Sequence, residues 1–162
     1  MLIACIRERS RRLQVPADLP APHDREALSH LLAMVGAQLL REVSDPTVVA
    51  AFRLAIAEAL QAPEVARVLD SIGRETARSA LRKIMTEATA AGLLEGRPAD
   101  LAEQFSALLW GDLMMSLLLG LAAQPNPREI AKRARDASAA FLQRTPMLPP
   151  NAPVRRPTLG ST

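Results

Sequence analysis

The feature that most constrains this chain is the stretch from Leu101 to Ala123, LAEQFSALLWGDLMMSLLLGLAA. After Gln104 its only formal charge is Asp112. We expect one helix over 101–123, and a helix that is apolar on every side has no face suited to water. It must therefore be covered by other helices, by a second copy of the chain, or by lipid.

Lipid is the cover that the sequence favours least. The run from Phe105 to Ala123 approaches the length of about 20 residues that spans a bilayer. However, Asp112 falls in its middle, where an ionised carboxylate costs roughly 2.5–3.5 kcal/mol on insertion. The preceding helices also carry apolar stripes that need a partner. We therefore prefer a buried helix in an all-α bundle, and a membrane-associated helical protein is the lesser alternative.

Composition supports the all-α class. The chain of 162 residues has no Tyr and only 2% aromatic residues, so strand-forming residue types are scarce. Its single cysteine, Cys5, forms no intrachain disulfide, and together with His23 and His30 it provides too few ligands for a zinc cluster. The opening MLIACIRERSRR lacks the order of a secretory signal, so we expect a cytoplasmic protein. The net charge of +3 is spread along the chain, which does not favour a nucleic-acid surface.

Capping residues and prolines divide the chain into helices. Asp24 is suited to cap a helix that ends near Val43, and Asp45 with Pro46 is suited to begin the next one. Asn126, followed by a proline and by a glutamate three positions on, predicts a capping box for the last helix. These signals predict six helices, over 2–13, 24–43, 47–60, 64–91, 101–123 and 127–144.

The longest predicted helix, over 64–91, reads as one rod. Apolar residues keep helical spacing in both of its ends, while its middle is polar at Arg74, Glu75 and Arg78. Gly73 weakens the rod by about 1 kcal/mol relative to Ala. Gly92 should end it with a residue in the left-handed conformation.

No catalytic constellation is visible in the sequence. The chain has no glycine-rich phosphate loop, no nucleophile elbow and no pair of histidines at metal-ligand spacing. We therefore expect no enzyme activity, no cofactor and no metal site. Arg53 and Glu58 are interpreted as a structural ion pair or cap, and His30 as a residue at the edge of the core. Asp112 either orients a ligand or pairs with an arginine of a neighbouring helix, since a buried unpaired charge is costly.

Methionine and aromatic side chains suggest an adaptable apolar cavity, because methionine repacks around different shapes. The same side chains are equally suited to an ordinary core, and the sequence leaves both interpretations open. Met114, Met115 and Trp110 belong to this set. The hypothesis of a ligand pocket names Met34, Phe52, Ile56, Met85, Phe105, Leu109 and Asp112.

Small residues on the apolar helix suggest a face for self-association. Gly111 and Gly120 would let another helix approach closely, and the last helix also has an apolar stripe to cover. Two such helices from each of two copies would form a four-helix interface with twofold symmetry. The predicted dimer interface comprises Gly111, Met115, Leu118, Ile130, Ala134, Ala137 and Phe141.

Two segments, VVAAFRLAIAEALQAPEVARVLDSIGRE and AAGLLEGRPADLAEQFSALLWGDLMMSLLLG, resemble a known family. They are similar to the C-terminal ligand-binding and dimerisation domain of TetR-type transcriptional regulators, in particular the AefR-like proteobacterial subgroup. The resemblance covers about 25–142 of the chain. It is carried by Phe52, Arg53, Ala57, Glu58, Ala59, Pro63, the turn 91–93, Phe105, Gly111, Asp112 and Gly120.

The resemblance implies a division of the chain into three parts. Residues 1–22 would be a remnant connecting helix and a linker, 23–144 the effector-binding and dimerisation domain, and 145–162 a disordered tail. The effector pocket would lie inside the bundle, for a small apolar effector, and the last two long helices would form a homodimer. Such regulators begin with a helix-turn-helix head, which this chain does not supply, so we expect a truncated gene product, a misassigned start or a fragment.

Two hypotheses about function follow from the resemblance. In the first, the chain is the effector-binding and dimerisation domain of a TetR-type regulator and contacts DNA only through a missing N-terminal domain or a full-length partner. In the second, it is a stand-alone interaction module that forms heterodimers with full-length regulators and blocks their binding to DNA.

Overall fold

The computed structural model describes residues 4, 8 and 20–147, and every regular element in that part of the chain is helical. The predicted all-α class is confirmed. The helix expected over 2–13 lies outside the described residues. The elements are α2 (Arg25–Val43), α3 (Pro46–Ala57), α4 (Pro63–Leu69), the π-helical turn η1 (Asp70–Arg74), α5 (Glu75–Ala90), α6 (Pro98–Trp110), α7 (Leu113–Leu118) and α8 (Pro127–Arg144).

Three helices, α2, α3 and α8, begin at the capping residues predicted for them, whereas α6 begins at Pro98, before the predicted start at 101. The Ala27 N–H donates to Asp24 Oδ1 at 2.7 Å, and the Thr47 N–H donates to Asp45 Oδ1 at 2.9 Å. Asn126 and Glu129 form the predicted capping box at the start of α8, each side chain accepting from the other residue's N–H. These caps satisfy N–H groups that have no partner inside the helix.

The predicted rod over 64–91 is continuous, but its middle is not α-helical. α4, η1 and α5 follow one another without a break, and the Glu75 N–H donates to the Asp70 carbonyl five residues earlier. This wider turn is the π-helical form, which inserts one residue into an otherwise α-helical ladder. Gly92, with φ of 73°, ends the rod in the left-handed conformation, as predicted.

The single helix expected over 101–123 is broken into two. α6 ends at Trp110, Gly111 adopts φ of 48°, and α7 contains only six residues before Gly120 turns the chain again. Arg133 of α8 stabilises the break by donating to the carbonyls of Leu109 and Trp110, at 2.8 and 2.6 Å. The prediction of two long final helices was wrong because it considered apolar spacing alone and not these capping hydrogen bonds.

Within one chain, the other helices do not cover this stretch on every side, and cover by a second copy stays a prediction. Met115 is 60% exposed, Leu119 64% and Leu121 78%.

None of the described helices combines the length and the apolar character that a membrane span requires.

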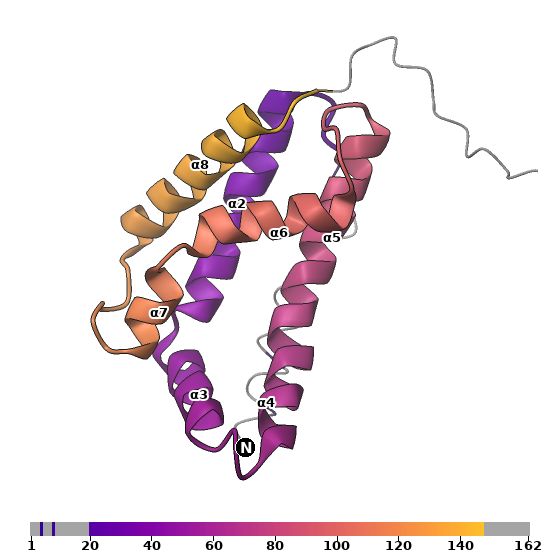
Figure 1. The fold of residues 1–162 in the computed structure, drawn as a ribbon. Helices are drawn as coiled ribbons and strands as arrows, with labels where there is room; N and C mark the ends of the chain where they lie inside the picture. Colours follow the sequence, from indigo (N-terminus) through magenta and orange to yellow (C-terminus); the bar gives the residue numbers. More distant parts are fainter. Residues whose placement is uncertain (1–3, 5–7, 9–19, 148–162) are drawn as a thin grey trace, which may run out of the picture.

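The main core lies where α2, α6, α8 and the C-terminal part of α5 meet (Figure 1). α2 and α8 pack side by side, and α6 crosses next to them. Phe105 of α6 meets Phe141 of α8 edge to face, with ring centroids 5.6 Å apart. Gly36 of α2 allows the close approach, because a Cβ there would lie 3.0 Å from Leu109 Cδ1. We call these four helical segments the packed half.

Arg25 connects several segments at one end of the packed half by hydrogen bonds. Its guanidinium donates to the carbonyls of Leu93 and Thr145, both at 3.0 Å, and to that of Leu142. The Glu95 N–H also donates to the Pro146 carbonyl at 3.1 Å. The ordered unit therefore continues past the boundary predicted at residue 144, and the remainder of the predicted tail, 148–162, lies outside the described residues.

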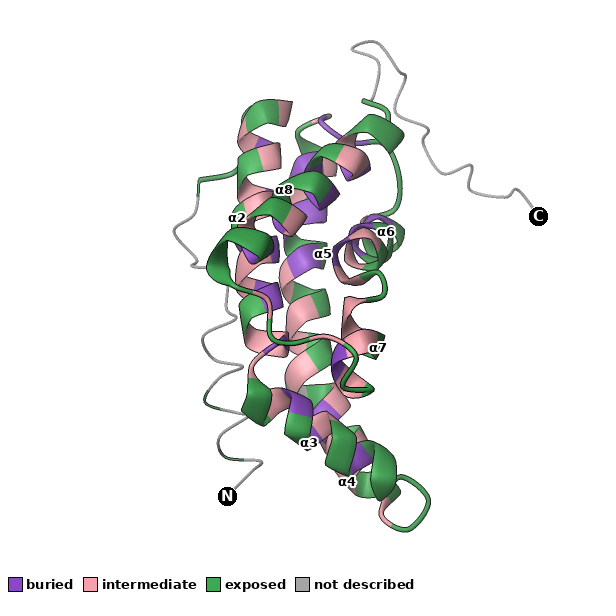
Figure 2. Ribbon diagram, turned by 90° about the vertical axis from the view of Figure 1, so that its left-hand side faces the viewer, coloured by how far each residue is buried: buried purple, intermediate pink, exposed green. Residues whose placement is uncertain are grey.

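The remaining elements, α3, α4, η1 and α7, pack more sparsely. Their buried cluster consists of Ala51, Ala55 and Leu69, with Val65 against it. Much of α3 is exposed in Figure 2, and Leu69 is the buried residue of α4, in contrast to the buried faces of α2 and α5. Arg53 links α3 to the end of α7, donating to the carbonyls of residues 117 and 118 at 2.7 and 2.9 Å. We call these four elements the cavity half.

Candidate functional site

A cavity of about 690 Å³ lies between the packed half and the cavity half. Residues of α2, α3, α4, η1, α5, α6 and α7 line it. Cavities that hold small molecules commonly measure about 300–1,000 Å³ and combine apolar walls with a few polar groups. This cavity has the size and the mixed lining of such a site.

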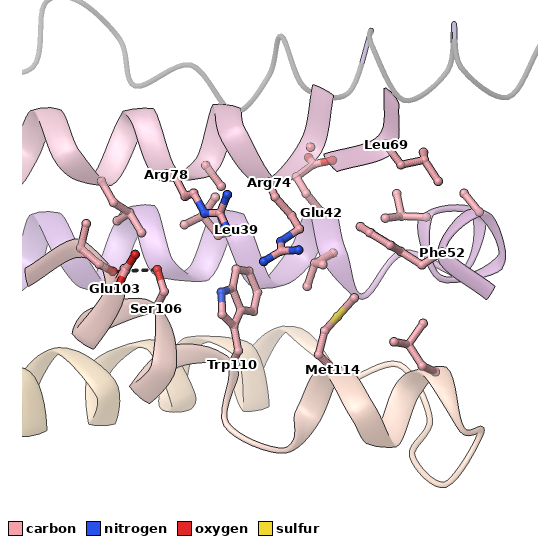
Figure 3. Close-up of a pocket in the computed structure, with 18 of the residues that line it drawn as sticks. Leu39, Glu42, Phe52, Leu69, Arg74, Arg78, Glu103, Ser106, Trp110 and Met114 are labelled. Atoms are coloured by element: carbon pink, nitrogen blue, oxygen red, sulfur yellow. Dashed lines mark hydrogen bonds between the residues drawn. The ribbon is translucent and has the colours of Figure 1, made fainter. Parts of the chain in front are cut away.

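The walls formed by the cavity half are apolar. Val48, Phe52 and Ile56 of α3 line one side, and Met114 and Leu118 of α7 line another. Figure 3 shows Phe52 and Met114 on separate elements around the same space. Several of these side chains are unbranched or only half buried, so this wall has room to repack around different molecules.

The rod supplies a wall with two parallel rows of residues. Leu69, Gly73, Ala77 and Leu81 form the first, at intervals of four residues. In a strict α-helix the last of these would point about 120° away from the first. The wider turn of η1 reduces this rotation, so both ends of the row reach the cavity.

The second row of the rod is cationic: Arg74, Arg78 and Arg82. Figure 3 shows Arg74 and Arg78 extending from the rod toward the side where Trp110 and Met114 lie. Arginine keeps its charge at any pH at which proteins are studied. The rod therefore gives an otherwise largely apolar cavity one positively charged side.

Two of these arginines have close carboxylate partners. Arg74 Nη1 lies 3.1 Å from Asp70 Oδ1, and Arg82 Nη2 is hydrogen-bonded to Glu75 Oε1. Arg78 Nη1 is 3.9 Å from the other oxygen of the same Glu75, which is beyond hydrogen-bond distance. These side chains are about half exposed, so the pairs contribute little to stability.

α6 presents different residues to the cavity and to the main core. Glu103, Ser106 and Trp110 line the cavity (Figure 3), whereas Phe105 and Leu109 are fully buried on the other side of the helix. The Ser106 hydroxyl donates to the Ala102 carbonyl at 2.8 Å, which satisfies its donor within the helix. With Glu42 of α2, Glu103 brings two carboxylates to the cavity lining.

Of the side chains predicted to form a pocket, the structure brings Phe52 and Ile56 to the cavity. Met85, Phe105 and Leu109 lie in the main core instead, each fully buried, because the packed half takes up the larger apolar side chains. Met34 is 49% exposed and does not line the cavity.

Asp112 is at the surface rather than inside the bundle. Its side chain is 90% exposed, and its Oδ1 lies 3.6 Å from Arg133 Nη2. Of the two roles considered for this residue, the geometry matches the arginine pair. Because Asp112 is exposed, its charge carries none of the cost of burial that the sequence argument assumed.

The residues predicted to form the dimer interface divide into two groups. Gly111 and Met115 are exposed, and Leu118 faces the cavity. The four on α8 are buried in the main core of the same chain: Ile130, Ala134, Ala137 and Phe141.

Sequence reasoning did not assign the arginine row to the site. The signal was present, because Arg74, Arg78 and Arg82 recur at intervals of four residues, which places them on one side of a helix. The polar middle of the rod was predicted at Arg74, Glu75 and Arg78, but no role in a site was assigned to it. In the part of the chain that the structure describes, no group of His, Cys, Asp and Glu side chains is arranged to hold a metal ion.

The structure is that of an all-α domain with a partly open cavity between two groups of helices. More specifically, residues 30–144 match the family described as the AefR-like transcriptional repressor C-terminal domain, and the chain belongs to this family of TetR-type domains. The expected family is thereby confirmed.

A solved structure supports the same fold. It is described as a TetR-family transcriptional regulator from Mesorhizobium loti MAFF303099, with a TM-score of 0.66 and 18% sequence identity. The match covers 89% of this chain and 67% of that one. At this identity the likeness concerns the fold alone. No curated protein matches the chain.

Proposed function

We propose that this chain is the effector-binding and dimerisation domain of a TetR-type transcriptional regulator. The observation that carries the proposal is the cavity of about 690 Å³ inside a domain of this family. Its apolar walls favour an effector that is itself largely apolar, since burying apolar surface provides most of the binding free energy. No catalytic role is proposed.

Effector binding would act by a shift of population between conformations. The cavity is bounded by α3 and α7, which Arg53 joins. Arg133 of α8 is hydrogen-bonded to the end of α6 directly before α7, and it lies 3.6 Å from Asp112, the N-cap residue of α7. A molecule that fills the cavity stabilises the arrangements in which α7 is displaced to accommodate it. Through Arg133 that displacement would reach α8, and through α8 a second copy.

Trp110 provides a direct test of effector binding. It is the only tryptophan of the chain and lines the cavity, so its fluorescence should change when the cavity is filled. The probe is N-phenyl-1-naphthylamine, a neutral apolar fluorophore, titrated at fixed protein concentration. We expect saturable quenching of Trp110 with energy transfer to the probe.

Two variants of α5 provide the matched comparison. Ala77→Leu places extra volume in the cavity, whereas Ser79→Leu adds it at an exposed position of the same helix that does not line the cavity. Ala77→Leu should weaken probe binding by about tenfold, or about 1.4 kcal/mol, and Ser79→Leu should leave it unchanged. Equal affinities in the two variants, or an absence of saturable binding, would contradict the proposal.

We also propose that the domain forms a homodimer through α7 and the outer side of α8. Met115 and Leu119 of α7 are mostly exposed in one chain, and burying them against a second copy would be favourable. The side of α8 opposite α2 would complete the interface. Light scattering at micromolar concentration should give the mass of a dimer, and Met115→Glu should convert it to a monomer. A monomeric starting protein would exclude this interface.

A second candidate function is a module that forms heterodimers with full-length regulators. The same exposed apolar residues of α7 support it, because a related subunit would cover them as well as a second copy does. Adding the chain in excess to a full-length AefR-like regulator bound to its operator should weaken the shifted band in a gel assay. An unchanged band at excess would eliminate this candidate.

A further inference from the structure

We propose that the cavity takes an elongated organic anion, with its carboxylate on Arg78 and its apolar chain against α3 and α7. This inference rests on the proposed effector function and specifies the chemical class of the ligand. The cavity provides the two features that such a molecule requires, a cationic side and an apolar side, on separate elements.

The cationic side is the row on the rod. Arg74, Arg78 and Arg82 all line the cavity, against two carboxylates, Glu42 and Glu103, from other helices. Asp70 and Glu75 pair with Arg74 and Arg82, so the charge available to a ligand is that of Arg78. Because these side chains are about half exposed, their attraction for an anion is moderate and depends on the salt concentration.

Arg78 is the arginine best placed to bind a carboxylate. Arg74 has Asp70 at 3.1 Å, and Arg82 is hydrogen-bonded to Glu75. The nearest carboxylate oxygen recorded for Arg78 in the described part of the chain belongs to that same Glu75, at 3.9 Å. Its guanidinium therefore retains donors, and a guanidinium binds a carboxylate through two parallel hydrogen bonds.

The apolar side determines the rest of the ligand. Phe52 and Ile56 of α3 and Met114 and Leu118 of α7 line the cavity away from the rod. Met114 in this wall suits a flexible alkyl chain, because the methionine side chain repacks along molecules of different shape. A medium-chain carboxylate satisfies both sides of the cavity at once.

The experiment compares three ligands that share one alkyl chain and differ in the charge of the head group. Decanoate, decanol and decyltrimethylammonium are titrated at neutral pH below their aggregation concentrations, with Trp110 fluorescence as the readout and calorimetry as the second measurement. We expect decanoate to bind about tenfold more tightly than decanol, because charge-assisted hydrogen bonds between Arg78 and the carboxylate contribute binding free energy of that size. Raising the salt concentration should reduce this preference.

Arg78→Gln tests the assigned residue. It should remove the preference for decanoate and leave decanol binding unchanged, which also shows that the variant is folded. Arg67→Gln, an exposed position of α4 that does not line the cavity, is the matched control and should keep the preference.

The possible failures are distinguishable. If decanol and decanoate bind equally, or if Arg78→Gln weakens all three ligands alike, the anion assignment is overturned while effector binding stands. A preference for decyltrimethylammonium also overturns it and points to Glu42 and Glu103 instead. If none of the three binds saturably, both this inference and the proposed effector function are contradicted.

Discussion

The packed half and the cavity half of this domain use apolar residues in opposite ways. In the packed half, Phe105 and Phe141 are fully buried and surrounded by leucines of α2 and α5. In the cavity half, the buried cluster is two alanines and one leucine, while larger side chains such as Leu54 and Ile56 are 49% and 61% exposed. The packed half is stabilised by close packing, whereas the cavity half leaves unfilled space between its side chains.

This difference separates stability from binding within one small domain. Close packing makes a core rigid, because each side chain is held by its neighbours and the loss of even one methylene disturbs their contacts. A wall that is sparsely packed changes shape at little cost in free energy, as a binding site for varied ligands requires. Hydrogen bonds connect both ends of α7 to their surroundings: Arg53 binds the carbonyls at its C-terminal end, and Arg133 binds those of Leu109 and Trp110 just before it begins.

The largest effect should come from comparing one phenylalanine in each half. Phe141→Ala removes a fully buried ring and should lower the free energy of unfolding by about 3–5 kcal/mol. Phe52→Ala removes a half-buried ring that faces the cavity and should cost only about 1 kcal/mol. Urea unfolding followed by circular dichroism measures both. Equal losses would refute the division into two halves.

A smaller effect is expected at the break between α6 and α7. Gly111→Ala forces a side chain into φ of 48° and places its Cβ 2.8 Å from Arg133 Nη2. Strain and the disturbed hydrogen bonds should together lower the free energy of unfolding by about 2–4 kcal/mol. Gly92→Ala is the control, because φ is 73° there but no atom lies within 4 Å of the added carbon. It should cost about 1–2 kcal/mol.

If Gly92→Ala proves as destabilising as Gly111→Ala, the contact with Arg133 contributes nothing to the break. Thermal unfolding with the two variants measured side by side decides this.

Loss of the link between α3 and α7 should have a local effect. Arg53→Ala removes two hydrogen bonds to carbonyls at the end of α7 and should lower the free energy of unfolding by about 1 kcal/mol. Amide hydrogen exchange should become faster in α7 and stay unchanged in α8. Arg67→Ala on the exposed side of α4 should change neither, and faster exchange throughout the chain would show that Arg53 supports the whole fold.

The smallest expected effect is a gain in stability. Gly73 lies in η1, and no atom is within 4 Å of a Cβ added there. Gly73→Ala should therefore raise the free energy of unfolding by about 0.4–1 kcal/mol, because alanine restricts the unfolded chain. A rise in the melting temperature checks it. A fall would mean that the π-helical turn depends on glycine.

The boundaries of several helices could be read directly from the sequence. Asp24, Asp45 and the Asn126–Glu129 box each act on N–H groups within three residues, so the signal and its effect lie in the same short segment. The left-handed glycine at position 92 is equally local. The candidate site was less predictable, because Phe105 and Trp110 are close in sequence but face different sides of α6.

The sequence by itself determined the all-α class, the family and the points at which most helices begin, since each depends on composition or on neighbours along the chain. Only the tertiary structure decided the break at Gly111, the division of α6 between core and cavity, and the arginine row beside apolar walls. These features depend on contacts between residues far apart in sequence, such as Arg133 with Trp110. Apolar spacing along one helix carries no information about which distant side chain will meet it.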